Sequence, residues 1–329
     1  MFGYPKQACL HLPTPVNYLS NLSERLGIEL YIKRDDLTEF GLGGNKLRKL
    51  EYHIYDAKEK GATMLITVGG AQTNHGRLTA AIAAKNRMKC AVISMDDYPG
   101  ELSSNMLLER IFGAHVVLHK ADGTPIMDVV ERVAEKYESQ GERCYFIPMG
   151  GSNEIGALGY YECAQELKHE FKSGHVITAL GSMGTYMGLF CGLHDSSLHL
   201  TGIQIMPYEE DILKYASNYF NTVKSAWKLD FNVTADDFDI NEDYLYGGYN
   251  VPSKEVRDAI YDMARSEAII LDPCYTGKAY AALLDMIEQG KIKKGETVIF
   301  LHTGGFPGLY TPNHRKAFEE ELIDGVTIL

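Results

Sequence analysis

Apolar runs rich in Val, Ile and Leu alternate with amphipathic stretches along most of this 329-residue chain, and this alternation constrains the fold most strongly. Several runs are almost continuously apolar, as expected for strands buried on both faces of a parallel sheet. Strands that alternate with helices are typical of an α/β fold with parallel-rich sheets flanked by helices. We expect strands at residues 30–33, 64–68, 90–95, 115–119, 145–148, 176–180, 200–205 and 297–302.

The stretches between these strands carry helical periodicity, most clearly at residues 45–60, 74–88, 125–139 and 154–171. Gly61, Gly113 and Gly141 each follow a helical run, at the position where a left-handed glycine commonly ends a helix. Four β-α periods between residues 62 and about 148 predict a compact unit of their own. Residues 208–249 break the rhythm with aromatic and acidic residues and no clear strand. Their pattern leaves open whether they form an inserted helical segment or a lid.

Composition narrows the class of protein. Hydrophobic residues make up 45% of the chain and charged residues 23%, which is ordinary for a globular protein. The length suits two domains that share a cleft. The net charge of −12 is scattered along the chain, whereas nucleic acids and anionic membranes require a concentrated basic surface. We therefore expect neither as a partner, although a local cluster of donors could still bind a small anion.

The cysteines and the N-terminal residues suggest where the protein acts. The six cysteines lie far apart without a C-x-x-C pair, so we expect free thiols in a reducing compartment and no metal site. The first residues lack the basic and apolar segments of a signal peptide, and no apolar stretch approaches the length of a membrane span. The expected location is the cytoplasm.

Residues 181–185 form the glycine-containing turn best suited to an anion, because they lie where a strand meets a helix. Gly181 and Gly184 allow backbone amides to approach a phosphate, Met183 lies between them, and Ser182 and Thr185 add hydroxyl groups. The turn matches neither the dinucleotide fingerprint nor the P-loop. A single turn of this kind can also serve only to tighten the backbone.

Lys46 is a sharper candidate, because it follows Gly43, Gly44 and Asn45 at the start of an expected helix. The positive end of the helix and the two nearby basic residues should both disfavour its ammonium form, as an amine nucleophile requires. The alternative is a solvated lysine on a basic helix face.

Other polar side chains lie at similar turns. Thr73, Asn74 and His75 open a helix, where they could meet a carboxylate; alternatively Thr73 or Asn74 caps the helix and His75 is exposed. Tyr275 precedes a helix that should begin near Thr276, and Thr303 ends the last expected strand. Each of these could contact a ligand or serve only in packing or capping.

Taken together, these segments resemble the D-cysteine desulfhydrase and 1-aminocyclopropane-1-carboxylate (ACC) deaminase family of pyridoxal-phosphate enzymes. The resemblance covers essentially the whole chain, and its segments occur in family order. They are PTP at 13–15, YIKRDD at 31–36, GGNKLRKLE at 43–51, QTNH at 72–75, GGSN at 150–153, GSMGT at 181–185, LDPCYTGK at 271–278 and HTGG at 302–305.

The resemblance implies a tryptophan-synthase-β-like fold of type II, and a homodimer. The small α/β domain would span residues 51–150, and the large cofactor-binding domain would combine residues 1–50 and 151–329. Lys46 would form a Schiff base with pyridoxal 5'-phosphate. The remaining cofactor contacts implied are Asn74 to the ring oxygen, Thr303 to the ring nitrogen, and Gly181, Ser182, Met183, Gly184 and Thr185 to the phosphate.

The chemistry implied is β-elimination from a small amino acid. The amine of Lys46 removes the Cα proton, the β-substituent leaves, and the product hydrolyses to pyruvate and ammonia. Thr73, with Asn74 and His75, would hold the substrate carboxylate. Tyr275 would assist proton transfer or substrate placement, and Tyr249 could face the substrate. Lys46, Tyr275 and Thr73 are thus the expected catalytic residues.

Departures from the family pattern indicate the branch. The deaminase branch has Gln in place of His75 and Glu in place of Thr276. The Glu of the deaminase branch stabilises a protonated ring nitrogen, whereas the hydroxyl of Thr303 cannot do so in the same way. This favours β-elimination, most simply of D-cysteine, over ACC deamination. Thr73 replaces the usual serine and crowds the carboxylate pocket, so L-cysteate and β-chloro-D-alanine remain alternative substrates. A ligand-binding protein without turnover is the third possibility.

Overall fold

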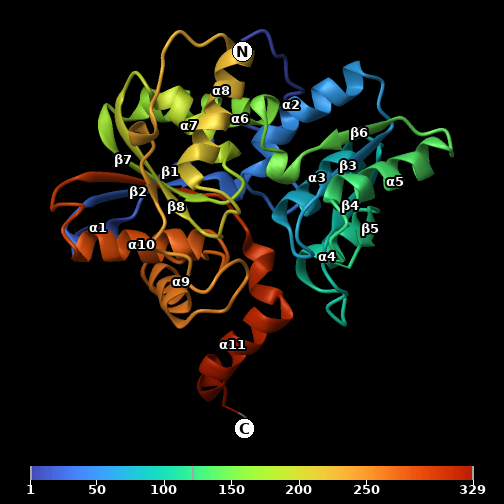
Figure 1. The fold of residues 1–329 in the computed structure, drawn as a ribbon. Helices are drawn as coiled ribbons and strands as arrows, with labels where there is room; N and C mark the ends of the chain where they lie inside the picture. The colour runs from blue at the N-terminus through green and yellow to red at the C-terminus, as the bar shows by residue number, and fades with distance from the viewer. Residues whose placement is uncertain (1, 121, 328–329) are drawn as a thin grey trace.

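The structure, a computed structural model, describes residues 2–120 and 122–327. Two separate sheets lie side by side and form the two lobes of the molecule in Figure 1. The larger sheet has the strand order β1-β2-β10-β7-β8-β9, and only the β1–β2 pair is antiparallel. Its strands are β1 (Val16–Tyr18), β2 (Glu29–Arg34), β7 (Ser173–Leu180), β8 (Ser197–Gln204), β9 (Ile240–Asn241) and β10 (Thr297–His302).

The smaller sheet is wholly parallel, with the strand order β5-β4-β3-β6. Its strands are β3 (Met64–Val68), β4 (Lys89–Ser94), β5 (His115–Leu118) and β6 (Cys144–Ile147). The helices are α1 (Ser20–Leu26), α2 (Lys46–Glu59), α3 (Asn74–Lys85), α4 (Ser104–Ile111), α5 (Ile126–Glu138), α6 (Glu154–Glu170), α7 (Gly184–Leu193), α8 (Ile212–Trp227), α9 (Lys254–Glu267), α10 (Thr276–Glu288) and α11 (Pro312–Leu322). The predicted parallel-rich α/β fold is therefore confirmed.

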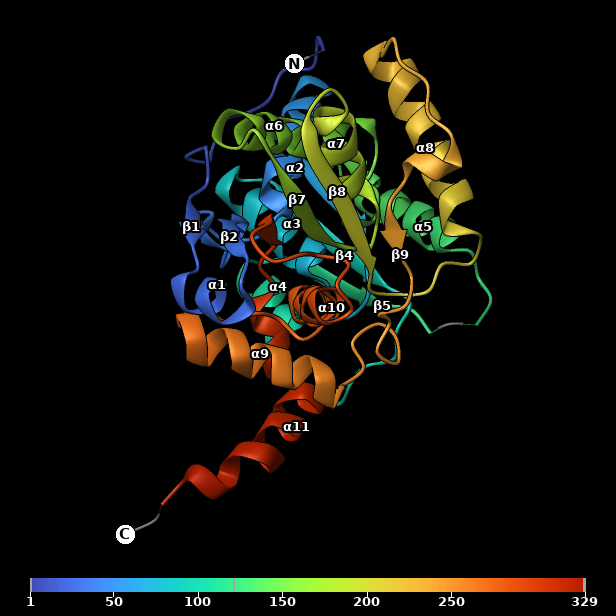
Figure 2. The ribbon, with the colours of Figure 1, turned by 90° about the vertical axis from the view of Figure 1, so that its left-hand side faces the viewer.

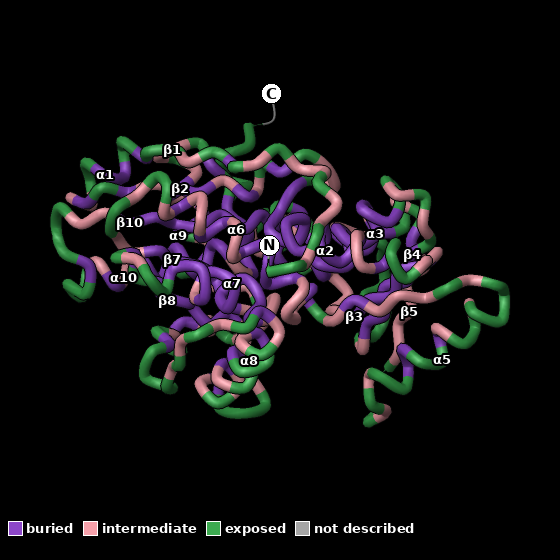
Figure 3. Tube along the Cα trace, turned by 90° about the horizontal axis from the view of Figure 1, so that it is seen from above, coloured by how far each residue is buried: buried purple, intermediate pink, exposed green. Residues whose placement is uncertain are grey.

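Helices cover both faces of each sheet because successive side chains of a strand point to opposite faces. In β10, Val298 and Phe300 pack into the core beneath α1, α9 and α10, while Ile299 and Leu301 pack into the core beneath α6, α7 and α8. In β3 of the smaller sheet, Leu65 faces α2 and α3, whereas the neighbouring Ile66 faces α5. Figure 3 shows the buried trace concentrated in the sheets and in α2, α6 and α7, with α5 and α8 outside.

The eight predicted strands are all present, each within three residues of its expected ends, and β3 and β10 have the expected bounds. Two short edge strands, β1 and β9, were missed. Strands of three and two residues are too short for an apolar pattern to distinguish them from loop. The three helix-ending glycines do adopt positive φ, between 67° and 90°.

Residues 208–249 contain α8 and the short strand β9, so the expectation of no strand in this segment is wrong. β9 pairs with β8 through Gly202 and Ile203 and extends the larger sheet by one strand. The segment is thus an inserted helix and an edge strand that pack on the larger sheet.

The predicted domain division stays a prediction, and its outer limits, residues 1 and 329, lie outside the described residues. The boundary at residue 51 falls inside α2, and the boundary at residue 150 falls inside the short helix Met149–Gly151. α11 projects away from both sheets (Figures 1 and 2). None of the described helices is long and apolar enough to cross a membrane.

Candidate active site

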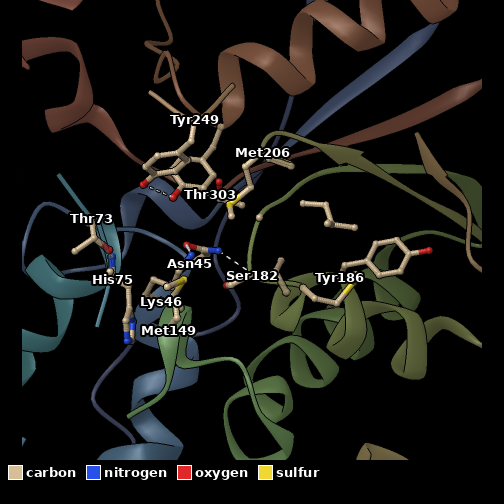
Figure 4. A pocket seen from close by; sticks show the side chains of 18 of the residues that line it. Asn45, Lys46, Thr73, His75, Met149, Ser182, Tyr186, Met206, Tyr249 and Thr303 are labelled. Atoms are coloured by element: carbon tan, nitrogen blue, oxygen red, sulfur yellow. Dashed lines mark hydrogen bonds between the residues drawn. The ribbon is translucent and has the colours of Figure 1, made fainter. Parts of the chain in front are cut away.

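A cavity of about 230 Å³ lies where loops from the two sheets meet. It is lined by residues that follow the carboxyl ends of parallel strands, where α/β folds commonly bind ligands. Figure 4 shows their side chains converging from both sheets around Lys46. The lining residues are Asn45, Lys46, Gly69, Gly70, Thr73, His75, Met149, Gly150, Ala179, Leu180, Gly181, Ser182, Met183, Thr185, Tyr186, Met206, Tyr249, Tyr275 and Thr303.

Lys46 is the first residue of α2 and is buried, so it is not a solvated lysine on a basic helix face. Burial lowers the pKa of its amine from 10.5 to about 8; Asp272 opposes this shift and Arg77 adds to it. The predicted lowering of the Lys46 pKa is therefore right. Its main cause is burial and not, as expected, the charge of the neighbouring basic residues. One of those neighbours, Arg48, pairs with Asp35 and does not line the cavity.

Asn45 is a site residue that the sequence interpretation did not single out. Lys46 Nζ donates to Asn45 Oδ1 at 2.9 Å, and Asn45 Nδ2 donates to Thr185 Oγ1 at 2.9 Å. Asn45 thus connects the amine to the turn of residues 181–185. Because Thr185 Oγ1 accepts this bond, its own hydrogen stays available for an anion. The sequence feature that could have indicated Asn45 is its position directly before Lys46 and after two glycines.

The turn of residues 181–185 leads from β7 into α7, which begins at Gly184, so its amides are those of a helix N-terminus. Met183 takes the left-handed conformation with φ of 66°, whereas neither Gly181 nor Gly184 has a positive φ. A Cβ at Gly184 would lie 2.5 Å from Ser152 Oγ and 2.9 Å from Lys49 Nζ. The predicted anion-binding turn therefore has the close packing and the donors that a phosphate requires.

Lys49 lies beneath this turn and is the second residue that sequence reasoning missed. It is buried, and its Nζ donates to the Gly150 carbonyl at 3.1 Å and approaches Ser152 Oγ at 3.4 Å. Burial and the nearby Lys46 hold the pKa of its amine well below the ordinary value. A phosphate beside it would supply the missing negative charge. The sequence feature that could have indicated Lys49 is its spacing of three residues from Lys46, which places both lysines on the same helix face.

Thr73 caps α3: its Oγ1 accepts from the backbone N–H groups of His75 and Gly76, at 3.2 and 3.3 Å. The predicted cap is thus confirmed, and the Thr73 hydroxyl hydrogen remains free to donate into the cavity. A Cβ at Gly69 would lie 2.7 Å from Thr73 Oγ1, so the strand end before the turn approaches Thr73 closely.

His75 is buried, which contradicts the alternative of an exposed first-turn histidine. Its Nε2 lies 2.8 Å from Thr67 Oγ1, and that hydroxyl donates to the Ile147 carbonyl at 2.8 Å. Because the hydroxyl has one hydrogen, Nε2 must carry the proton in this pair. Burial, followed by the positive charges of Lys46 and other nearby bases, holds the pKa of the imidazole well below its ordinary value. A neutral ring of this tautomer has an acceptor at Nδ1, which is buried and has no hydrogen-bond partner among the described residues.

Tyr249 and Tyr275 form one wall of the cavity. Their hydroxyl oxygens are 2.8 Å apart, and Lys46 Nζ lies 5.9 Å from the centre of the Tyr275 ring. Burial raises the pKa of both phenols, so both remain protonated at neutral pH. As predicted, Tyr275 directly precedes α10. The structure brings both tyrosines to Lys46.

Thr303 lines the cavity at the end of β10, as expected. Thr276 does not line it: its Oγ1 donates to Asp272 Oδ1 at 2.7 Å and accepts from the Asp272 N–H at 2.8 Å. Among the lining residues described, none is acidic. Asn74 is not a lining residue either, although its neighbours Thr73 and His75 are, and its Oδ1 accepts from Asn105 Nδ2 at 2.9 Å.

The donor set fits pyridoxal phosphate. A buried amine of lowered pKa suits the aldehyde, and the turn at Gly184 with Lys49 suits the phosphate. Metal binding has less to support it, because no group of three or more His, Cys, Asp or Glu side chains in the described part of the chain could hold an ion.

Comparisons with known proteins show the family to which the chain belongs. Residues 10–304 match the family described as pyridoxal-phosphate dependent enzymes. A solved structure of an ACC deaminase homologue is 33% identical, covers 98% of this chain and 97% of its own, and has a TM-score of 0.87. An O-ureido-L-serine synthase has 20% identity, coverage of 95% and 93%, and a TM-score of 0.66. A hydrogen sulfide-producing enzyme from Fusobacterium nucleatum has 20% identity, coverage of 89% and 96%, and a TM-score of 0.63.

The last two likenesses concern the fold alone, whereas the family match and the first structure cover nearly the whole chain. The family match names pyridoxal phosphate as the cofactor. The chain therefore belongs to the family of pyridoxal-phosphate dependent enzymes of fold type II, in the group that includes ACC deaminase and D-cysteine desulfhydrase.

Proposed function

We propose that this chain catalyses β-elimination from a small amino acid, most simply D-cysteine, with water as the second reactant and pyruvate, ammonia and hydrogen sulfide as products. The observation that carries this proposal is the absence of acidic side chains among the described residues that line the cavity. The position where the deaminase branch has Glu is Thr276, whose hydroxyl is engaged by Asp272. Without a carboxylate, the ring nitrogen has no partner that favours its protonated form.

The residues then have separate tasks. Bound pyridoxal phosphate supplies an electron sink to the amino acid that it holds. Lys46 Nζ removes the proton from Cα, which its lowered pKa favours because more of the amine is unprotonated. Thr73 donates its free hydroxyl hydrogen to the substrate carboxylate, with Asn74 beside it. Tyr275, hydrogen-bonded to Tyr249, places the substrate or transfers a proton.

His75 has a different task from the one expected. A neutral imidazole with its proton on Nε2 has no second donor for a carboxylate. We propose that it instead holds the start of α3 in place through its bond to Thr67. The same proposal includes two cofactor contacts, that of Asn74 with the ring oxygen and that of Thr303 with the ring nitrogen. It also includes the division into two domains, the homodimer and the cytoplasmic location.

A panel assay tests the reaction. D-cysteine, L-cysteine, L-cysteate, D-serine and β-chloro-D-alanine are compared by kcat/KM for pyruvate and ammonia release, with sulfide and sulfite measured to identify the leaving group. We expect D-cysteine to lead and Lys46→Ala to abolish turnover. If L-cysteate or β-chloro-D-alanine leads, that compound and not D-cysteine is the better description of the substrate. Turnover of none of them would leave a ligand-binding protein as the better description.

The second candidate is ACC deamination, because the structure at 33% identity is described as an ACC deaminase homologue. Its product, 2-oxobutyrate, is distinguishable from pyruvate by mass. We expect none from ACC, since none of the described residues that line the cavity provides the carboxylate that this reaction needs. Release of 2-oxobutyrate at a kcat/KM above that for D-cysteine would overturn the β-elimination proposal.

A further inference from the structure

Two buried side chains and a half-buried one form a chain of hydrogen bonds beside the cavity. Arg77 Nη1 donates to Asn105 Oδ1 at 3.1 Å, and Asn105 Nδ2 donates to Asn74 Oδ1 at 2.9 Å. Arg77 and Asn105 have no exposed surface. The chain runs from α3 to α4 and back to the first residue of α3, which lies between the cavity-lining Thr73 and His75. It therefore ends beside two residues that line the cavity, although Asn74 is not itself a lining residue.

The direction of these bonds is fixed at the Arg77 end. A guanidinium group only donates hydrogen bonds, so the Asn105 atom that faces Arg77 must be its oxygen. A second contact gives the same orientation, because Asn105 Nδ2 donates to the Gln72 backbone carbonyl at 2.8 Å, and a carbonyl only accepts. Two independent partners thus determine which way the Asn105 amide is turned.

The orientation of Asn105 in turn determines that of Asn74. Because the amino group of Asn105 faces Asn74, the facing Asn74 atom must be its oxygen. The Asn74 amino group is then left with its donors free. A pyridoxal ring carries its oxygen as an anion when it is deprotonated, and such an oxygen accepts a hydrogen bond but would be repelled by an amide oxygen.

We propose that Arg77 and Asn105 are positioning residues, which turn the Asn74 amide so that it donates to the ring oxygen of the cofactor. This inference rests on the proposed function in one respect, the contact between Asn74 and the ring. Arg77 also donates from Nη2 to the Gly43 carbonyl at 2.9 Å, in the turn just before Lys46. The same guanidinium therefore positions the backbone at the amine and the amide at the ring.

N105D is the informative variant. The new carboxylate still accepts from Arg77 but cannot donate to Asn74, which then turns its own amino group toward position 105. Its oxygen faces the cofactor ring. We expect the Kd for pyridoxal phosphate to rise about tenfold to a hundredfold, as for the loss of a hydrogen bond to a charged group. The visible absorbance maximum of the bound cofactor should also shift.

A double-mutant cycle separates positioning from a general structural role. Kd and absorbance are measured for wild type, N74A, N105D and N74A/N105D, with thermal melting of each apoprotein to establish folding. If Asn105 acts through Asn74, N105D has no further effect in the N74A background. Additive effects in the double variant would overturn the proposal.

The cycle also distinguishes this inference from its premise. If N74A leaves both Kd and absorbance unchanged, the proposed contact of Asn74 with the ring is wrong, and the positioning role falls with it. If N74A weakens binding while N105D does not, only the positioning role is wrong. N86D is the matched control, because it makes the same amide-to-carboxylate change at the far end of α3; it should leave the Kd unchanged.

Discussion

Two lysines three residues apart on one helix are given different properties by what surrounds them. Lys46 is buried beside the cavity, within reach of the charges of Asp272 and Arg77, and its pKa is about 8. Lys49 is buried under the turn of residues 181–185 without a carboxylate among its hydrogen-bond partners. The first has an amine suited to reaction, and the second has an amine that lacks a counter-charge. Both properties depend on how each amine is buried. The residue type, lysine in both cases, does not show this.

The lowered pKa of Lys46 predicts a pH dependence for cofactor capture. In apoprotein mixed with pyridoxal phosphate and trapped with borohydride, the rate of Lys46 modification should be half-maximal near pH 8. It falls below this pH because the ammonium form dominates there, and it levels off above it. Mass spectrometry of the peptides measures the rate, with the exposed Lys316 as internal reference. A rate that still rises above pH 10 would contradict the lowered pKa.

Lys49 should contribute to binding of the phosphate group and not of the ring. Lys49→Met removes the charge at similar length, so the Kd for pyridoxal phosphate should rise about tenfold to a hundredfold. The Kd for pyridoxal, which has no phosphate, should stay nearly constant. Absorbance titration measures both, and Lys60→Met at the exposed end of α2 is the control. Equal losses for the two ligands would argue against a phosphate contact.

At the scale of elements, α7 depends on glycines for its close approach to α6. A Cβ at Gly188 would lie 2.2 Å from the Ala157 carbonyl oxygen and 2.6 Å from Tyr160 Cβ. The absence of a side chain lets the two helices pack backbone against backbone. Because α7 begins at Gly184, this packing also determines where the turn of residues 181–185 lies.

Gly188→Ala should therefore destabilise the protein. Forcing α6 and α7 apart costs about 1–3 kcal/mol in the free energy of unfolding, more than the gain in helix propensity. Urea denaturation of the apoprotein measures the change. Gly325→Ala is the matched control, since no atom lies within 4 Å of the added Cβ there, and it should stay within about 0.5 kcal/mol of wild type. A Gly188→Ala variant as stable as the control would show that the helices move apart freely.

At the scale of the whole molecule, the cavity joins the two sheets. Met149 and Gly150 follow β6 of the smaller sheet, and a Cβ at Gly150 would collide with Ser182, which follows β7 of the larger sheet. Ser152 Oγ lies 2.8 Å from Ser182 Oγ and accepts from the Gly184 N–H at 3.2 Å. The loop that leaves the smaller sheet is thus packed against the turn that would hold the phosphate.

Cofactor binding should accordingly stabilise both lobes together. Apoprotein with pyridoxal phosphate at 100 times its Kd should gain about 2.7 kcal/mol in the free energy of unfolding. Hydrogen–deuterium exchange should fall at the start of α3, at residues 149–152 and at residues 181–185. α11, which projects from the body, should be unaffected. Protection confined to one sheet would contradict the coupling.

Much of this architecture could be predicted from the sequence, because the pattern of apolar residues reflects burial directly. Strands such as β3 and β10, buried on both faces, have continuous apolar runs, and left-handed glycines end the preceding helices. Lys46, Thr73 and the turn at Gly181 to Thr185 stand at strand–helix junctions, whose position in the chain already indicates their place at a sheet edge. The edge strands β1 and β9 were missed because they are too short to show an alternation of apolar and polar residues.

Contacts between distant residues were decided only by the tertiary structure. The tautomer of His75 depends on Thr67 and Ile147, which lie on strands β3 and β6. The orientation of Asn74 depends on Asn105, which lies on another helix, α4, and through it on Arg77. The shift in the pKa of Lys46 likewise comes mainly from burial, and Asp272, which opposes it, is far away in sequence. Local patterns report which residues are apolar and where the chain turns. Hydrogen-bond direction and burial of charge arise only when the chain is folded, because both depend on which groups meet.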